Sequence, residues 1–130
     1  MVFRDNFWFL SNMYPCSIQY KGHTYTCVEA AFQAQKDAEC ANKFESLDGF
    51  AAKKLGRNVK LRPDWELVKK KIMKDILKAK FTDPELKAKL KAVSGEIVED
   101  NSWNDTYWGR CNGKGENNLG KLLMEVRDML

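Results

Sequence analysis

The chain has 130 residues and a formal net charge of +4, with 44% hydrophobic and 31% charged residues. This size fits one domain over residues 1–130. No apolar run is long enough for a membrane span, and no secretory leader is expected. The four cysteines form no C-x-x-C pair and His23 is the only histidine, which argues against a structural zinc site. We expect a cytoplasmic protein with reduced thiols.

The first part of the chain is predicted to form a short β-hairpin followed by a helix. Residues 17–20 and 23–26 alternate between polar and apolar side chains, and Lys21-Gly22 between them supplies a turn. From Cys27 onward, the apolar residues recur with helical spacing.

Further helices are expected along the rest of the chain. The predicted elements are helices over residues 41–47 and 49–56 (with Gly56 as C-cap), from Pro63, from Thr82 and from Leu119, a strand at Ile97-Val98, and an ordered loop over residues 101–118. The fold class is therefore predicted to be α+β, a mostly helical domain with a small antiparallel sheet.

Much of the basic excess lies on the long helix that opens at Pro63. Its basic residues are Lys69, Lys70, Lys71, Lys74, Lys78 and Lys80. We interpret them as the solvated face of an amphipathic helix rather than as a nucleic-acid-binding patch. A nucleic-acid binder would show affinity that falls steeply with salt, and the aromatic residues are not interleaved with these lysines.

Hydrolytic chemistry in this chain would depend on carboxylates, because a single histidine gives little support for a nucleophilic triad. Breaking a glycosidic bond builds positive charge on the sugar, which an ionised Asp or Glu stabilises. Glu29 is the first candidate, but its spacing from Thr26 also matches a capping box, and spacing alone favours the cap. Gln33 and Lys36 on the same face, and Arg57, are either contacts for hydroxyl and phosphate oxygens or ordinary surface residues.

Residues 99–109 form the second candidate segment, which has three aromatic side chains among Asn and acidic residues. In one interpretation the aromatic rings stack on a base while Asn104 and Asp105 fix its edge or a ribose. In the other, Trp103 and Trp108 fill the core while Asn104-Asp105 form a turn. The residues alone support both equally.

Six short segments along the chain form an ordered pattern. They are residues 9–12 (FLSN), 28–36 (VEAAFQAQK), 55–57 (LGR), 61–65 (LRPDW), 103–109 (WNDTYWG) and 118–124 (NLGKLLM). In this order and without large gaps, the chain resembles the NADAR family, also called the YbiA-like or DUF1768 family.

The resemblance implies a YbiA-like fold and an N-glycosidase that hydrolyses a ribose–base bond without a metal or cofactor. Some members act on ribosylamino-pyrimidine phosphates of riboflavin biosynthesis, and others remove ADP-ribose from guanine in DNA or nucleosides. Glu29 matches the family's catalytic carboxylate, acting as base or stabiliser of the oxocarbenium ion, and Asp105 is the candidate second acid. The candidate substrate-binding residues are Asn12, Gln33, Lys36, Arg57, Trp103, Asn104, Tyr107, Trp108, Gly109 and Asn118.

The implied partner is an ADP-ribose or ribose-phosphate substrate, free or linked to nucleic acid such as ADP-ribosylated DNA. Neither a membrane nor an obligate protein partner is expected. Met13, Ala30 and Cys27 depart from the residues usual in the family, which bears on substrate choice more than on reaction type. The alternative function is a module that binds ADP-ribose or NAD without cleaving it.

Overall fold

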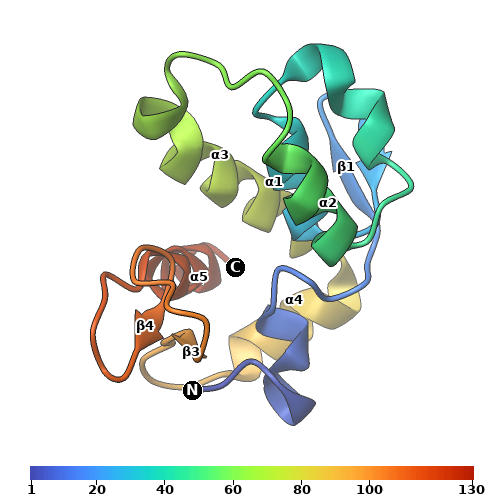
Figure 1. Cartoon of the computed structure of the whole chain (residues 1–130). Helices are drawn as coiled ribbons and strands as arrows, with labels where there is room; N and C mark the ends of the chain where they lie inside the picture. The colour runs from blue at the N-terminus through green and yellow to red at the C-terminus, as the bar shows by residue number, and fades with distance from the viewer. The chain divides into compact units, whose positions relative to one another are not determined.

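The computed structural model describes all 130 residues of the chain. They divide into two compact units: the middle unit covers Asn12–Lys80, and the terminal unit combines Met1–Ser11 with Phe81–Leu130 (Figure 1). The predicted α+β class is confirmed, because the chain is mostly helical and carries a small antiparallel sheet. None of the helices is both long enough and apolar enough to pass through a membrane.

The middle unit combines a β-hairpin with four helices. Its elements are β1 (Ile18–Tyr20), β2 (His23–Tyr25), α1 (Val28–Ala34), the 3₁₀ helix η2 (Ala38–Phe44), α2 (Gly49–Gly56) and α3 (Trp65–Lys80). The predicted hairpin is confirmed: Ile18 lies opposite Tyr25 in the antiparallel register. Lys21 and Gly22 both have positive φ angles, which suit a tight hairpin turn.

Helix α1 forms the centre of the middle unit. All seven of its residues are buried, including the polar Glu29 and Gln33. It packs against α2 and α3 and against the hairpin (Figure 1). From α3, Trp65 and Ile72 are buried as well, and each such side chain contributes about 1.5–3 kcal/mol by leaving water. The apolar packing therefore holds α1 in place along its whole length.

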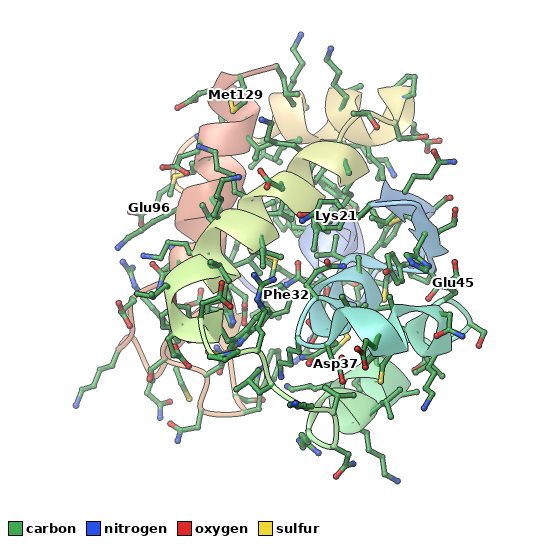
Figure 2. All side chains as sticks on the ribbon, turned by 90° about the horizontal axis from the view of Figure 1, so that it is seen from above. Lys21, Phe32, Asp37, Glu45, Glu96 and Met129 are labelled. Atoms are coloured by element: carbon green, nitrogen blue, oxygen red, sulfur yellow. The ribbon has the colours of Figure 1, made fainter.

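Two predicted helix boundaries in the middle unit are wrong. The helix expected over residues 41–47 is the 3₁₀ helix η2, which begins earlier because Asp37 caps it, its carboxylate accepting from Glu39 N at 3.3 Å. Figure 2 labels Asp37 at this junction. Gly56 is the last residue of α2 rather than its C-cap, and Arg57 takes the cap position with an ordinary right-handed conformation.

The terminal unit pairs the start of the chain with its second half. Its elements are the 3₁₀ helix η1 (Asp5–Leu10), α4 (Pro84–Ala92), β3 (Asp100–Asn101), β4 (Arg110–Cys111) and α5 (Asn118–Asp128). The amide of Asp100 donates to Met1 O at 2.9 Å, which ties the N-terminus to β3. Helix α5 buries the leucines of its predicted apolar face, Leu119, Leu122 and Leu123.

The strand predicted at Ile97-Val98 is wrong, because the carbonyls there bond to a side chain and to the N-terminal amine, which donates to Val98 O at 2.8 Å, instead of to another strand. Asn117 Nδ2 donates to Ile97 O at 2.9 Å. The nearest strand is β3, which pairs in parallel with β4 within the segment expected to be a loop. Gly120 permits this close packing, since a Cβ there would lie 2.1 Å from Ile97 O.

Candidate active site

Cys27 sets the start of α1, the helix that carries Glu29. Its backbone is extended, and its Sγ accepts a hydrogen bond from Ala30 N at 3.4 Å. The predicted capping box, with Thr26 as N-cap, is therefore wrong. The Thr26 hydroxyl instead donates to Leu47 O. Burial raises the pKa of the Cys27 thiol, which keeps it protonated and suited to a structural role.

Glu29 lies in the first turn of α1 and is only 8% exposed. Its Oε1 accepts a hydrogen bond from Gln33 Nε2, one turn further along, at 2.9 Å. Its backbone amide donates to Asn12 O at 3.0 Å, which holds Asn12 beside the same turn. Buried carboxylates are costly unless they are hydrogen-bonded. This arrangement fixes one orientation of the carboxylate.

Two amide oxygens close to Glu29 are buried and accept no hydrogen bond. They are Asn12 Oδ1 and Gln33 Oε1. Because Gln33 Nε2 donates to the carboxylate, Gln33 Oε1 faces the other way, toward Gly56. A Cβ on Gly56 would lie 2.0 Å from that oxygen, so only glycine permits this approach. Gln33 Oε1 is thus covered by α2. Most buried polar groups in proteins are paired, so the remaining unpaired acceptor, Asn12 Oδ1, suits a ligand with a hydroxyl donor.

Lys36 continues the face of Glu29 and Gln33 just beyond the end of α1. Its Nζ lies above the ring of Trp65, 5.8 Å from the ring centroid. Trp65 packs in turn against Phe32, with ring centroids 4.9 Å apart, and Figure 2 labels Phe32 on α1. The amide of Arg62 donates to Lys36 O at 3.0 Å. The packing of α1 against the start of α3 thus positions the ammonium group.

Several charges meet around Lys36. Its partial burial lowers the pKa of the ammonium group, the charge of Glu29 opposes that effect, and the positive charges of Arg57 and Lys69 add to it. Arg57 follows α2 and is exposed, while Lys69 belongs to α3. The middle unit therefore brings together Asn12, Glu29, Gln33, Lys36 and Arg57 of the predicted site residues.

The remaining predicted site residues lie in the terminal unit, in the segment that links β3 to α5. Asp105 Oδ1 accepts hydrogen bonds from the amides of Tyr107 (3.1 Å) and Trp108 (2.9 Å). The Asn101 side chain bonds both the amide (3.1 Å) and the carbonyl (2.9 Å) of Asp105. Asn104 has a left-handed backbone, φ +64°. The segment is thus a turn organised by Asp105, whose role as a second acid stays a prediction.

The aromatic residues of this segment differ in exposure. Trp103 is 61% exposed, so the interpretation that it fills the core is wrong. Tyr107 and Trp108 are half-buried and meet edge to face, with ring centroids 4.8 Å apart. Asn118 opens α5, and its Nδ2 donates to Tyr107 O at 2.9 Å. An exposed Trp beside two fixed rings is compatible with ligand contact.

Glu99, which opens the second candidate segment, and Asn117 were not predicted as site residues, yet both are buried polar residues. Glu99 Oε1 accepts from Asn101 Nδ2 at 3.2 Å, and Glu99 N donates to Asn117 Oδ1 at 3.0 Å. A Cβ on Gly109 would lie 2.4 Å from Glu99 O, which explains the glycine. The Asn117 side chain bonds the backbone of residues 97 and 99 rather than capping α5, so no local pattern in the sequence indicated its role.

No group of three or more His, Cys, Asp or Glu side chains lies close enough together to hold a metal ion. All four cysteines are free.

Comparison with known proteins finds the same family along the whole chain. A model of the NADAR domain matches residues 2–130. The N-glycosidase YbiA of Shigella boydii is 38% identical, over 97% of this chain and 83% of that protein. An N-glycosidase of Nostoc punctiforme is 35% identical, over 91% and 82%. A riboflavin biosynthesis protein of Vibrio vulnificus is 34% identical, over 97% of this chain but 36% of that protein.

The fold is matched as well. The NMR structure of Escherichia coli YbiA resembles this chain with a TM-score of 0.84 at 38% sequence identity. The match covers 96% of this chain and 79% of that one.

Proposed function

This chain belongs to the NADAR family, and on that premise we propose that it is an N-glycosidase with Glu29 as its catalytic carboxylate. Two relatives that align along most of their length are named N-glycosidases, which supports hydrolysis of an N-glycosyl bond. The substrate is a ribose–base compound. This compound is either an ADP-ribosylated guanine, free or in nucleic acid, or a ribosylamino-pyrimidine phosphate of the kind used in riboflavin biosynthesis.

The observation that carries the proposal is a buried carboxylate held in one orientation beside an unpaired acceptor. Glu29 is 8% exposed and is bonded by Gln33 Nε2. A charge fixed in a site that excludes water stabilises a developing cation better than a mobile, solvated one. Asn12 Oδ1 is buried without a hydrogen-bond partner, and the backbone of Asn12 is bonded to Glu29 N, so this oxygen is suited to accept from a hydroxyl group of a ribose.

In the reaction, the bond between ribose C1′ and the base nitrogen breaks, and the base leaves with the electron pair. The positive charge spread over C1′ and the ring oxygen is stabilised by the Glu29 carboxylate. Water then adds to C1′, and its proton passes to Glu29 and on to the departed base. Lys36 and Arg57 supply positive charge for the phosphate of the substrate.

The segment around Asp105 contributes further contacts in this proposal. Asp105 acts as the second acidic group, and Trp103, Tyr107 and Trp108 contact the base or the ribose. The polar members are Asn104, Gly109 (through its backbone) and Asn118. The support for these roles is the match of residues 103–109 to the family pattern, together with the exposure of Trp103.

Product identification tests the proposal. The protein is incubated separately with ribosylamino-pyrimidine phosphate and with DNA carrying ADP-ribosylated guanine, and the released base and sugar are identified by mass spectrometry. We expect a free base from one of the two. Binding of ADP-ribose or NAD with no release from any substrate would instead favour the sensor module. Binding to DNA that falls steeply with salt and survives loss of Glu29 would favour a nucleic-acid binder.

A further inference from the structure

Helix α3 presents two residues on the side that faces Lys36. Trp65 begins the helix, and its ring lies beneath Lys36 Nζ at 5.8 Å. Lys69 is four residues further on, so its side chain leaves the helix on the same face as Trp65. The positive charge of Lys69 is close enough to Lys36 to lower the pKa of the Lys36 ammonium group. Helix α3 thus contributes one of its lysines to the surroundings of Lys36.

Lys69 differs from its neighbours on the same helix. Its side chain is 16% exposed, whereas that of Lys71 is 78% exposed and pairs with Asp75. Lys70 is exposed as well. The interpretation of the lysines as a solvated face holds for Lys70 and Lys71 but not for Lys69. It is also wrong for Lys80, at the end of the same helix, which is 2% exposed. Lys69 does pair with Glu66, but that carboxylate is 77% exposed, so the pair is weak and can be exchanged for a ligand.

The positive groups around Lys36 outnumber the negative ones. Beyond partial burial, the charges of Arg57, Lys69 and Lys53 act on Lys36 and lower the pKa of its ammonium group, whereas Glu29 is the carboxylate that raises it. The other carboxylate nearby is that of Glu66, which pairs with Lys69. Partly buried ammonium groups that repel one another are stabilised by an anion placed between them. A phosphoryl group has the charge and the several acceptor oxygens that such a cluster requires.

We propose that Lys69 is a specificity-determining residue that binds, together with Lys36 and Arg57, a phosphoryl group of the ribosyl substrate. Trp65 acts as a positioning residue, because its ring supports Lys36 between the helices. The identification of the ligand as the substrate rests on the proposed function, whereas phosphoryl binding itself does not. The Glu29 carboxylate then faces the sugar, and the cations face its phosphate.

Ligand titrations of the intact chain test this subsite without any turnover. The probes are ribose 5-phosphate, ADP-ribose and ribose, followed by NMR chemical shifts. We expect Lys69→Met to weaken the binding of ribose 5-phosphate by about tenfold, the effect of roughly one lost charge-assisted contact, and to leave the binding of ribose unchanged. Lys69→Arg keeps the charge and should retain binding within about threefold. The matched control is Lys70→Met, on the exposed neighbour, which should bind like wild type.

If wild type prefers ADP-ribose over ribose 5-phosphate and Lys69→Met weakens both, the phosphoryl group belongs to a diphosphate. The proposal is overturned if wild type binds ribose as tightly as its phosphates, if Lys69→Met binds them like wild type, or if Lys70→Met weakens them equally. Full turnover by Glu29→Gln alongside Lys69-dependent phosphate binding would reject the proposed catalytic role and leave the subsite standing.

Discussion

Gly56→Ala is predicted to impair catalysis without changing any ionisable group. A Cβ at position 56 would lie 2.0 Å from Gln33 Oε1 and 2.8 Å from its Cδ. Non-bonded heavy atoms need more than about 3 Å, so the Gln33 carboxamide must move by at least about 1 Å. It cannot move toward Glu29, because its Nε2 already lies 2.9 Å from the carboxylate. The carboxamide must therefore rotate away and release Glu29.

The two effects of this substitution differ in size. Losing a hydrogen bond to a charged group costs about 1.5–3 kcal/mol, while replacing glycine by alanine in a helix returns up to about 1 kcal/mol. We expect the protein to stay folded, with a melting temperature lower by about 4–8 °C. Turnover should fall by at least about tenfold, because the carboxylate loses the contact that orients it.

Thermal unfolding and turnover, measured on the same preparations, separate these effects. The control is the double variant Gly56→Ala with Gln33→Ala. If glycine acts only through Gln33, the double variant loses no more activity than Gln33→Ala alone. A folded Gly56→Ala protein with full turnover would refute the argument.

Three further predictions follow from buried contacts. Lys80 is buried, and burial lowers its pKa to about 8 in the folded protein. Above that pH the folded protein has lost the Lys80 proton, whereas the unfolded chain still binds it. The free energy of unfolding should therefore rise by up to about 3 kcal/mol between pH 8 and 10.5 in urea titrations, relative to Lys80→Met, and parallel curves would contradict this. Gly109→Ala places a Cβ 2.4 Å from the Glu99 carbonyl and should cost about 1–3 kcal/mol, and an unchanged melting temperature would disprove it. Asp105→Asn keeps the oxygen that accepts from two backbone amides, so it should melt like wild type yet lose activity if Asp105 is the second acid, whereas Asp105→Ala should lose both.

The local pattern of the sequence predicts most of the fold. The hairpin around Lys21-Gly22 and the helices opening near Pro63 and Thr82 are found where alternation, turn residues and caps predict them. The strand predicted at Ile97-Val98 does not form, because Asn117, twenty residues further along the chain, bonds Ile97 O. A side chain that replaces a strand partner leaves no periodic signal.

The sequence likewise predicts part of the candidate site and not the rest. Glu29, Gln33 and Lys36 follow from helical spacing, and the family resemblance gave them a role. The predicted capping box was wrong because the sulfur of Cys27 accepts the hydrogen bond from Ala30 N. Cysteine is not among the residues preferred at helix N-caps, so the sequence did not indicate it. Lys69 looked like any other lysine of its helix, since only the packing of α3 against α1 separates it from its neighbours. Spacing identifies a face of a helix, and tertiary contacts decide what lies opposite.

The turnover of Glu29→Gln tests the central claim most directly. Glutamine retains an oxygen that can accept from Gln33 Nε2, so the protein should fold normally while the negative charge is lost. The rate of base release should fall by about 10²–10⁴-fold, with Glu39→Gln, a change at an exposed position of η2, behaving like wild type. Base release at the wild-type rate by folded Glu29→Gln would contradict the account.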